Sequence, residues 1–179
     1  MKENKGITMV ALVITIVLLL ILAGISIGQG NKVIKASELE NLKTNMLLIK
    51  VKAKEYVENA NFKLGTNFEN ATDKATRVEN AKAELKGEEI TDISTIKGNI
   101  NISQETISND NAKYRYYYKL STDNLTDIGI TKVESNEKDG WYIIKYDIKN
   151  LGIEIYNTNG FENEGTKYYS LTELQNVEL

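Results

Sequence analysis

An uncharged apolar run near the N-terminus constrains this chain more than any other feature. The first six residues are mostly polar, and residues Ile7 to Ile27 then contain no charged side chain. As a helix, these 21 residues would extend for roughly 32 Å, which matches the hydrocarbon core of a bilayer. Only a helix satisfies its own backbone hydrogen bonds at that depth. We therefore predict one membrane-spanning helix, followed by a domain built from the remaining residues.

The charges beside the run predict its orientation. Lys2 and Lys5 precede it closely, so the short N-terminus should stay in the cytoplasm and the C-terminal domain should lie outside. A secretory signal peptide would have a shorter apolar core and a small-residue cleavage site, which Leu22-Ala23-Gly24 matches poorly. An uncleaved signal anchor fits the hydropathy equally well. Nearly all basic residues are lysine, and with the abundant Asn and Ile this suggests an AT-rich bacterial genome.

The junction at the start of the run carries a further signal. Lys5-Gly6 is followed by Ile7-Thr8-Met9-Val10 and the aliphatic run, and this resembles the N-terminus of type IV prepilins and of the pseudopilins of type II secretion and competence systems. In that family a prepilin peptidase cuts after the glycine at the cytoplasmic face, and the new N-terminus is methylated. The resemblance therefore makes Lys5, Gly6 and Ile7 the processing residues. It covers residues 1–30.

The same resemblance assigns assembly to the start of the mature helix, at Thr8 and Ala11. The family usually has Glu where this chain has Ala11, and that carboxylate pairs with the N-terminal amine of a neighbouring subunit. Ala11 cannot form this pair. Family members without the Glu include minor pseudopilins at the filament tip, so the departure favours a minor subunit. Ile7 also replaces the usual Phe.

Gly24 and Gly28 form a GxxxG spacing near the outer end of the run. One interpretation is close helix–helix packing during assembly, or a stretch that melts when the subunit enters a filament. The other is that small residues are common in membrane helices and lead here into a loop. The spacing alone favours neither.

Beyond the run, an amphipathic pattern predicts that a helix continues to Gly65, which should end it. The apolar residues are spaced alternately three and four apart. They are Leu39, Leu42, Met46, Ile49, Ala53, Tyr56 and Ala60. A coiled-coil dimer is one use of this stripe. We favour the other, in which the helix buries this face against a sheet of its own chain.

The rest of the chain predicts a small α+β domain. A helical pattern spans residues 68–85, and a short helix is expected at residues 123–128. Strand patterns cover residues 114–120, 141–148 and 153–156. Turns are expected at residues 149–152 and 157–160. These pieces form an antiparallel meander of three or four strands. Half-buried strand positions explain the clustered tyrosines, with a stacking or sugar-binding face as the alternative.

Composition excludes most catalytic chemistry. The chain has no Cys, no His and no Pro, which removes thiolate and imidazole nucleophiles, bases and metal ligands. No glycine-rich nucleotide loop is present, and the net charge of −3 argues against a nucleic-acid partner. We expect no enzyme and no cofactor. Calcium is a weak candidate at Asn157, Asn159, Glu162 and Glu164, where oxygen ligands surround a glycine turn; an exposed polar hairpin tip is the simpler interpretation.

Together these features predict a pilin-like α+β fold with four parts. They are a leader (1–6), a transmembrane or filament-core helix (7–28), an amphipathic helix extension (29–65) and an extracellular globular domain (66–179). The expected function is a minor pilin or pseudopilin subunit that resides in the bacterial cytoplasmic membrane and joins a filament, with the prepilin peptidase, the membrane and other pilin-like subunits as partners. The alternative is a single-pass extracellular binding or adhesion protein with an uncleaved anchor.

Overall fold

The computed structural model describes residues 9–96, 98, 100–127 and 141–178, with side chains from Lys32 onward within those ranges. The chain forms two compact units, residues 1–40 with Leu179 and residues 41–178. In the described part of the first unit, the backbone is helical, and the side chains of Val33 and Ile34 are 68% and 57% exposed. The second unit contains the sheet and is described below.

Helix α1 spans Met9–Leu64. In the second unit its buried stripe consists of Met46, Ile49, Ala53, Val57, Ala60 and Leu64. Gly65 ends the helix with a φ of +72°, a left-handed conformation that glycine adopts without strain, and its N–H donates to the Asn61 carbonyl at 3.0 Å. The predicted helix end is therefore confirmed.

The stripe differs from the predicted one at several positions, because Leu42 is only half-buried and Leu64 adds a further buried residue. Val57 is buried, whereas Tyr56 is only half-buried. The observed spacing follows the 3.6-residue repeat of a straight helix, and the predicted spacing followed the 3.5-residue repeat of a coiled coil. The burial occurs within one chain, as expected for a helix that packs against its own domain.

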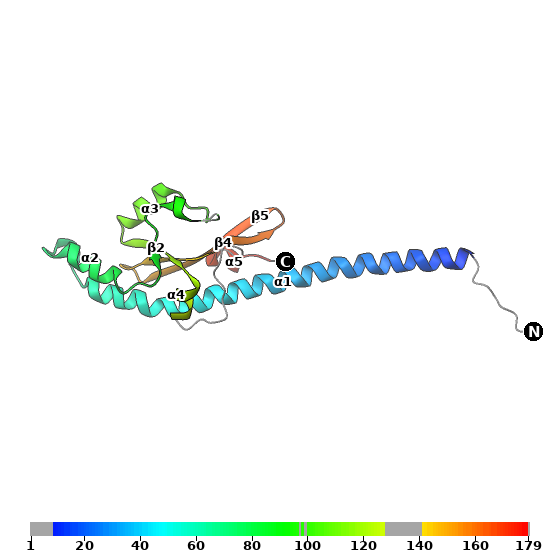
Figure 1. The fold of residues 1–179 in the computed structure, drawn as a ribbon, viewed down its shortest axis with the longest axis horizontal. Coiled ribbons are helices and arrows are strands. Elements are labelled where there is room, and N and C mark those ends of the chain that lie inside the picture. The colour runs from blue at the N-terminus through cyan, green and yellow to red at the C-terminus, as the bar shows by residue number, and fades with distance from the viewer. Residues whose placement is uncertain (1–8, 97, 99, 128–140, 179) are drawn as a thin grey trace, which may run out of the picture. The chain divides into compact units, whose positions relative to one another are not determined.

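Five strands form one antiparallel sheet in the order β1-β2-β3-β4-β5. Their bounds are Glu88–Glu89 (β1), Arg115–Leu120 (β2), Tyr142–Asp147 (β3), Gly152–Asn163 (β4) and Thr166–Ser170 (β5). The predicted antiparallel meander is confirmed, although it has five strands where three or four were expected. In the second unit α1 lies along one face of the sheet, and α3 (Gln104–Asn111) lies on the other (Figure 1).

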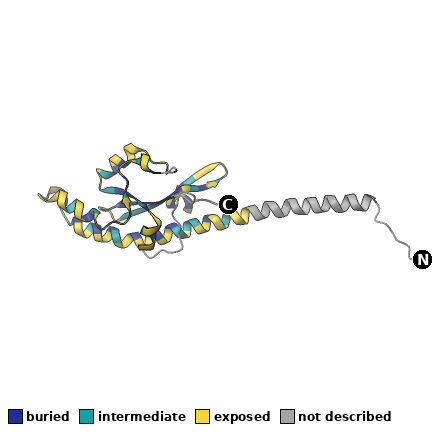
Figure 2. Ribbon diagram, viewed as in Figure 1, coloured by how far each residue is buried: buried dark blue, intermediate teal, exposed yellow. Residues whose placement is uncertain are grey.

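Both faces of the sheet are buried. Tyr118, Ile144 and Ile155 align across β2, β3 and β4 on the face toward α1. The opposite face carries Tyr117 and Ile143, which are 1% and 0% exposed. They join a second apolar cluster with Ile90, Ile96, Ile100 and Ile107. Figure 2 shows this burial concentrated on the sheet and along one side of α1. The predicted strands were half-buried, with one face toward solvent, and this prediction did not include the burial of the second face of the sheet.

Short helices complete the unit. They are η1 (Phe68–Asn70), α2 (Lys74–Lys82), η2 (Ile93–Thr95), α4 (Thr122–Asp127) and α5 (Leu171–Gln175). The short helix predicted at residues 123–128 is confirmed as α4 within the described residues. The long helical pattern of residues 68–85 is split into η1 and α2. Ser170 and Glu173 form a reciprocal capping box at the start of α5.

The turn predicted at residues 149–152 is confirmed, because Asp147 pairs with Gly152 across it. The turn predicted at residues 157–160 is wrong. Strand β4 runs through that segment with a register shift between Tyr156 and Phe161. The side-chain oxygen of Asn157 accepts hydrogen bonds from the backbone N–H groups of Asn159 and Gly160, at 3.0 and 3.1 Å. The chain therefore bulges here and reverses only at Glu164-Gly165.

Candidate functional site

The predicted processing and assembly residues fall in two groups. Lys5, Gly6, Ile7 and Thr8 lie outside the described residues. Ala11, Gly24 and Gly28 lie within α1, whose backbone is helical there, but their side chains are outside the described set. In the part of the chain from Lys32 onward that the structure describes, no helix is both long and apolar enough to cross a bilayer. The roles of all seven residues stay predictions.

Three of the weak calcium candidates, Asn157, Asn159 and Glu162, lie in strand β4, and the fourth, Glu164, lies in the turn that follows it. Asn157 is 2% exposed, and its side-chain oxygen is used by the bulge in β4. Glu162 points into solvent from the strand, and Glu164 lies in the turn after it. Among the described residues, no group of three or more acidic side chains is placed to hold a metal ion. The expected loop is thus a strand that ends in an exposed hairpin tip.

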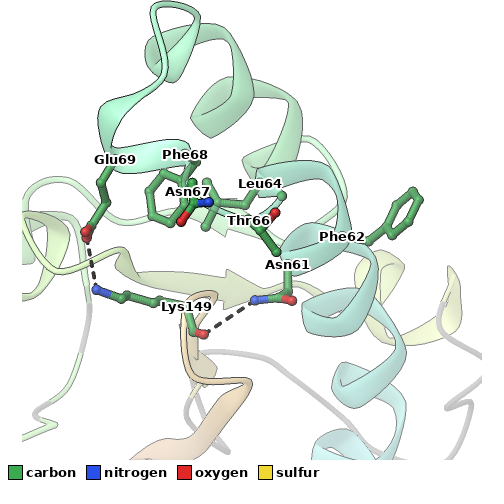
Figure 3. Close-up of a pocket in the computed structure, with 9 residues that line it drawn as sticks. Asn61, Phe62, Leu64, Thr66, Asn67, Phe68, Glu69 and Lys149 are labelled. Carbon is green, nitrogen blue, oxygen red and sulfur yellow. Dashed lines mark hydrogen bonds and ion pairs between the residues drawn. The ribbon is translucent and has the colours of Figure 1, made fainter.

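A hollow in the described unit lies where α1 ends. Two pockets of about 710 and 300 Å³ share Glu69 and Lys149, and we call them together the distal groove. The first is lined by residues 61, 62, 64–69 and 149, and the second by residues 69, 112–115, 149 and 150. Figure 3 shows Glu69 and Lys149 facing one another across the first pocket.

Local hydrogen bonds hold the groove in shape. The Lys149 Nζ lies 2.9 Å from a carboxylate oxygen of Glu69, and the Asn61 side-chain amide donates to the Lys149 carbonyl at 3.4 Å (Figure 3). The same amide donates to the neighbouring Ile148 carbonyl at 2.8 Å. Beneath them, the rings of Phe68 and Tyr114 meet edge to face with centroids 4.7 Å apart. The turn between β3 and β4 is therefore tied to the end of α1 and to the segment that follows it.

Basic residues dominate the edge of the groove. The Lys74 Nζ lies 5.7 Å from the centre of the Tyr114 ring, a cation–π contact. Lys113 is exposed beside it. Neither lysine forms an ion pair with another residue in the described ranges. Interaction with Tyr114 and, less strongly, attraction to the Glu69 carboxylate raise the pKa of Lys74.

A second cluster of charges lies on the sheet beneath α3. The Asp110 carboxylate accepts hydrogen bonds of 2.6 Å from both the Tyr117 hydroxyl and the Lys145 ammonium. Arg115 lies 3.5 Å from the same carboxylate and 2.7 Å from that of Asp147. These contacts link α3 to β2 and β3.

The pKa values in this cluster follow from burial and from the bonds. Burial raises the pKa of Asp110. Hydrogen bonds from Lys145 and Tyr117, together with the nearby Arg115, lower this pKa by more than burial raises it, so that it lies below its ordinary range. Burial, with the bond to Asp110, raises the pKa of Tyr117 far above its usual value. The carboxylate therefore stays charged and the phenol neutral near pH 7. The cluster therefore anchors α3 to strands β2 and β3.

Sequence reasoning missed both the groove and the Asp110 cluster. Glu69 and Lys149 are 80 residues apart, and only the fold brings them together. The predicted turn at residues 149–152 was the one local signal for the position of Lys149.

Comparisons with protein-family models, with curated proteins and with solved structures find no match to this chain.

Proposed function

We propose that this chain is a prepilin-like subunit, of the minor pilin or pseudopilin kind. It is processed after Gly6 and assembled through its apolar N-terminal helix into a type IV pilus or a type II secretion or competence pseudopilus. One observation carries the proposal: the α1 helix runs from Met9 to Leu64, so the element that starts beside the Gly6–Ile7 junction also contributes the helical layer of an α+β domain. The resemblance of residues 1–30 to prepilins implies that arrangement.

Assembly, rather than catalysis, is the proposed activity. Helices in a bilayer associate through close packing of small residues and interhelical hydrogen bonds, because lipid provides no hydrophobic driving force between them. The small residues at Gly24 and Gly28 suit such packing. Ala11 provides no carboxylate to pair with a neighbouring N-terminus, which is why we propose a minor subunit. The partners are the prepilin peptidase, other pilin-like subunits and the membrane.

N-terminal mass spectrometry tests this proposal directly. The full chain should be purified from bacterial cells with a prepilin peptidase and from cells without it. With the peptidase, the chain should begin at a methylated Ile7. Gly6→Leu should block cleavage, because a side chain at that position obstructs the extended backbone in the protease cleft. The leader variant Glu3→Ala is the matched control and should be cleaved like the wild type.

Two outcomes would overturn the proposal. An intact Met1 in both kinds of cell would mean an uncleaved anchor, and the protein would then be a single-pass extracellular binding or adhesion protein. A start near Gly28 would mean a secreted protein released by a signal peptidase.

A further inference from the structure

Strand β4 contains a bulge that one buried side chain holds in shape. The pairing of β4 with β5 is interrupted between Tyr156 and Phe161, where β4 has more residues than β5. Within this stretch the backbone N–H groups of Asn159 and Gly160 both donate to the side-chain oxygen of Asn157, at 3.0 and 3.1 Å. Asn157 therefore supplies, in the bulge, the acceptor that a partner strand supplies elsewhere in the sheet.

The bulge also requires glycine at position 160. Gly160 has a φ of +63°, and a Cβ atom there would lie 2.8 Å from the Tyr168 carbonyl oxygen and 2.9 Å from a ring carbon of Tyr169. Only glycine fits such a close approach in the left-handed conformation. Gly160 follows Asn159, which is exposed, and the two residues are the one Asn-Gly pair of the sequence. The fold therefore places this pair at the surface of the sheet.

An Asn-Gly pair can react with itself, because glycine has no side chain that obstructs ring closure. The Gly160 backbone nitrogen bonds to the side-chain carbonyl carbon of Asn159. The displaced amide group takes up the proton of that nitrogen and leaves as ammonia, and a succinimide ring remains. Water then opens the ring at either carbonyl and gives aspartate or isoaspartate. The reaction consumes water and needs no oxidant, cofactor or enzyme.

We propose that Asn159–Gly160 is a site of spontaneous deamidation, and that Asn157 suppresses the reaction while the β4–β5 hairpin is closed. Ring closure requires the Gly160 nitrogen to lose its proton and to turn toward the Asn159 side chain. Both changes break the hydrogen bond from this nitrogen to Asn157. Because Asn157 is 2% exposed, water does not replace its oxygen as the acceptor while the strand is in place.

Deamidation at this position should leave a lasting record that the hairpin has opened. Local opening of a strand requires less free energy than unfolding of the whole domain, and each opening exposes the pair to reaction. Isoaspartate lengthens the main chain of β4 just before Phe161, which disturbs the register that pairs Phe161 with Tyr168. The inference goes beyond the proposed function, because it concerns the chemical lifetime of the globular domain and requires neither the leader nor another subunit.

Mass spectrometry of the aged full-length chain tests the reaction. The protein should be purified in detergent and incubated at mildly alkaline pH, either folded or in concentrated guanidinium chloride. The peptide that contains Asn159 is then analysed for conversion of the amide to an acid. We expect the folded wild type to react at least about tenfold more slowly than the denatured chain, because reaction follows the population of the open form. Equal rates in the two conditions, or a product that persists in Asn159→Gln, would overturn the proposal.

Variants of Asn157 test its role in the folded chain. Asn157→Ala should increase the rate about tenfold, as expected for the loss of a buried acceptor. Asn157→Asp keeps an oxygen that accepts both N–H groups and should stay close to the wild-type rate. Met46→Ala is the matched control, because it removes a buried side chain of α1 and leaves Asn157 unchanged. It should alter the rate less than about twofold, since local opening governs the reaction.

Two results would overturn the role of Asn157. Equal acceleration in Met46→Ala and Asn157→Ala would mean that unfolding of the whole domain governs the reaction. Equal rates in Asn157→Asp and Asn157→Ala would mean that the acceptor oxygen gives no protection. The comparison of folded and denatured wild type stands even if Asn157→Ala does not fold. No result bears on cleavage after Gly6, so this proposal and the proposed function fail separately.

Discussion

Among the described residues, Asp110 is the only charged residue that is buried, with 7% of its surface exposed. Its position is stable because three partners offset the cost of removing a carboxylate from water. Removing the charge would leave Lys145 and Arg115 facing a neutral group in a partly enclosed site, and an uncompensated buried charge is costly. The residue therefore contributes to stability through its partners rather than through its own burial.

We predict that Asp110→Asn lowers the free energy of unfolding at pH 7 by about 2 kcal/mol, the usual size for a lost hydrogen bond to a charged group. Because the pKa of Asp110 is lower in the folded chain than in the unfolded chain, its stabilisation is present above the unfolded value of about 3.9 and is lost as the pH falls through the folded value. Wild-type stability should therefore fall as the pH drops below about 5, and the variant should show a flatter profile.

Urea titrations across this pH range check the prediction. Asp123→Asn is the matched control, because Asp123 is exposed in the first turn of α4. Its profile should follow that of the wild type. If Asp110→Asn loses no stability at pH 7, the cluster beneath α3 does not anchor that helix.

Gly87, which directly precedes β1, lies close to the backbone of β2. It adopts a φ of +113°, and a Cβ atom at this position would lie 2.8 Å from the Lys119 carbonyl oxygen. Gly165 has a φ of +78°, and a Cβ there would meet nothing within 4 Å. We predict that Gly165→Ala costs about 1 kcal/mol from backbone strain alone. Gly87→Ala should cost clearly more, about 3 kcal/mol, since β1 must shift away from β2. Equal losses in chemical denaturation would contradict this prediction.

At the scale of the element, α1 presents two different faces in the second unit. Six residues of its inner stripe are buried, whereas Leu47, Leu48 and Val51 are 43%, 49% and 69% exposed on the same turns. The inner face stabilises the domain by removing apolar area from water. The outer face makes no such contribution within one chain. Stability and surface properties of this helix can therefore be changed separately.

Adjacent substitutions in α1 make that separation measurable. Met46 is 0% exposed and Leu47 is 43% exposed, although they are neighbours in sequence and similar in size. We predict that Met46→Ala lowers the free energy of unfolding by about 3 kcal/mol through lost burial and a cavity. Leu47→Ala should change it by less than about 0.5 kcal/mol. Thermal or urea unfolding of the two variants would show whether the stripe has been placed correctly; similar losses in both would mean that it has not.

At the scale of the whole molecule, sequence reasoning succeeded where local patterns decide the structure. The helix end at Gly65, strand β3 and the turn at residues 149–152 follow from periodicity and turn residues within a few positions. Reasoning failed where distant segments decide. Tyr117 and Ile143 are buried because Ile90, Ile96, Ile100 and Ile107 pack against them on the second face of the sheet. The distal groove depends on contacts such as Glu69 with Lys149, which no local pattern records.

The second unit should fold without the N-terminal run, because its core lies within residues 41–178. We predict that a chain lacking residues 1–31 retains α+β circular dichroism and a cooperative urea transition. A chain lacking residues 1–57 is the matched control. It loses four stripe residues, Met46, Ile49, Ala53 and Val57, exposes the sheet face that α1 covers, and should show no cooperative transition. If the longer chain also fails to fold cooperatively, residues before Lys32 contribute to the core; if both fold, α1 is dispensable and the sheet is stable with one face uncovered.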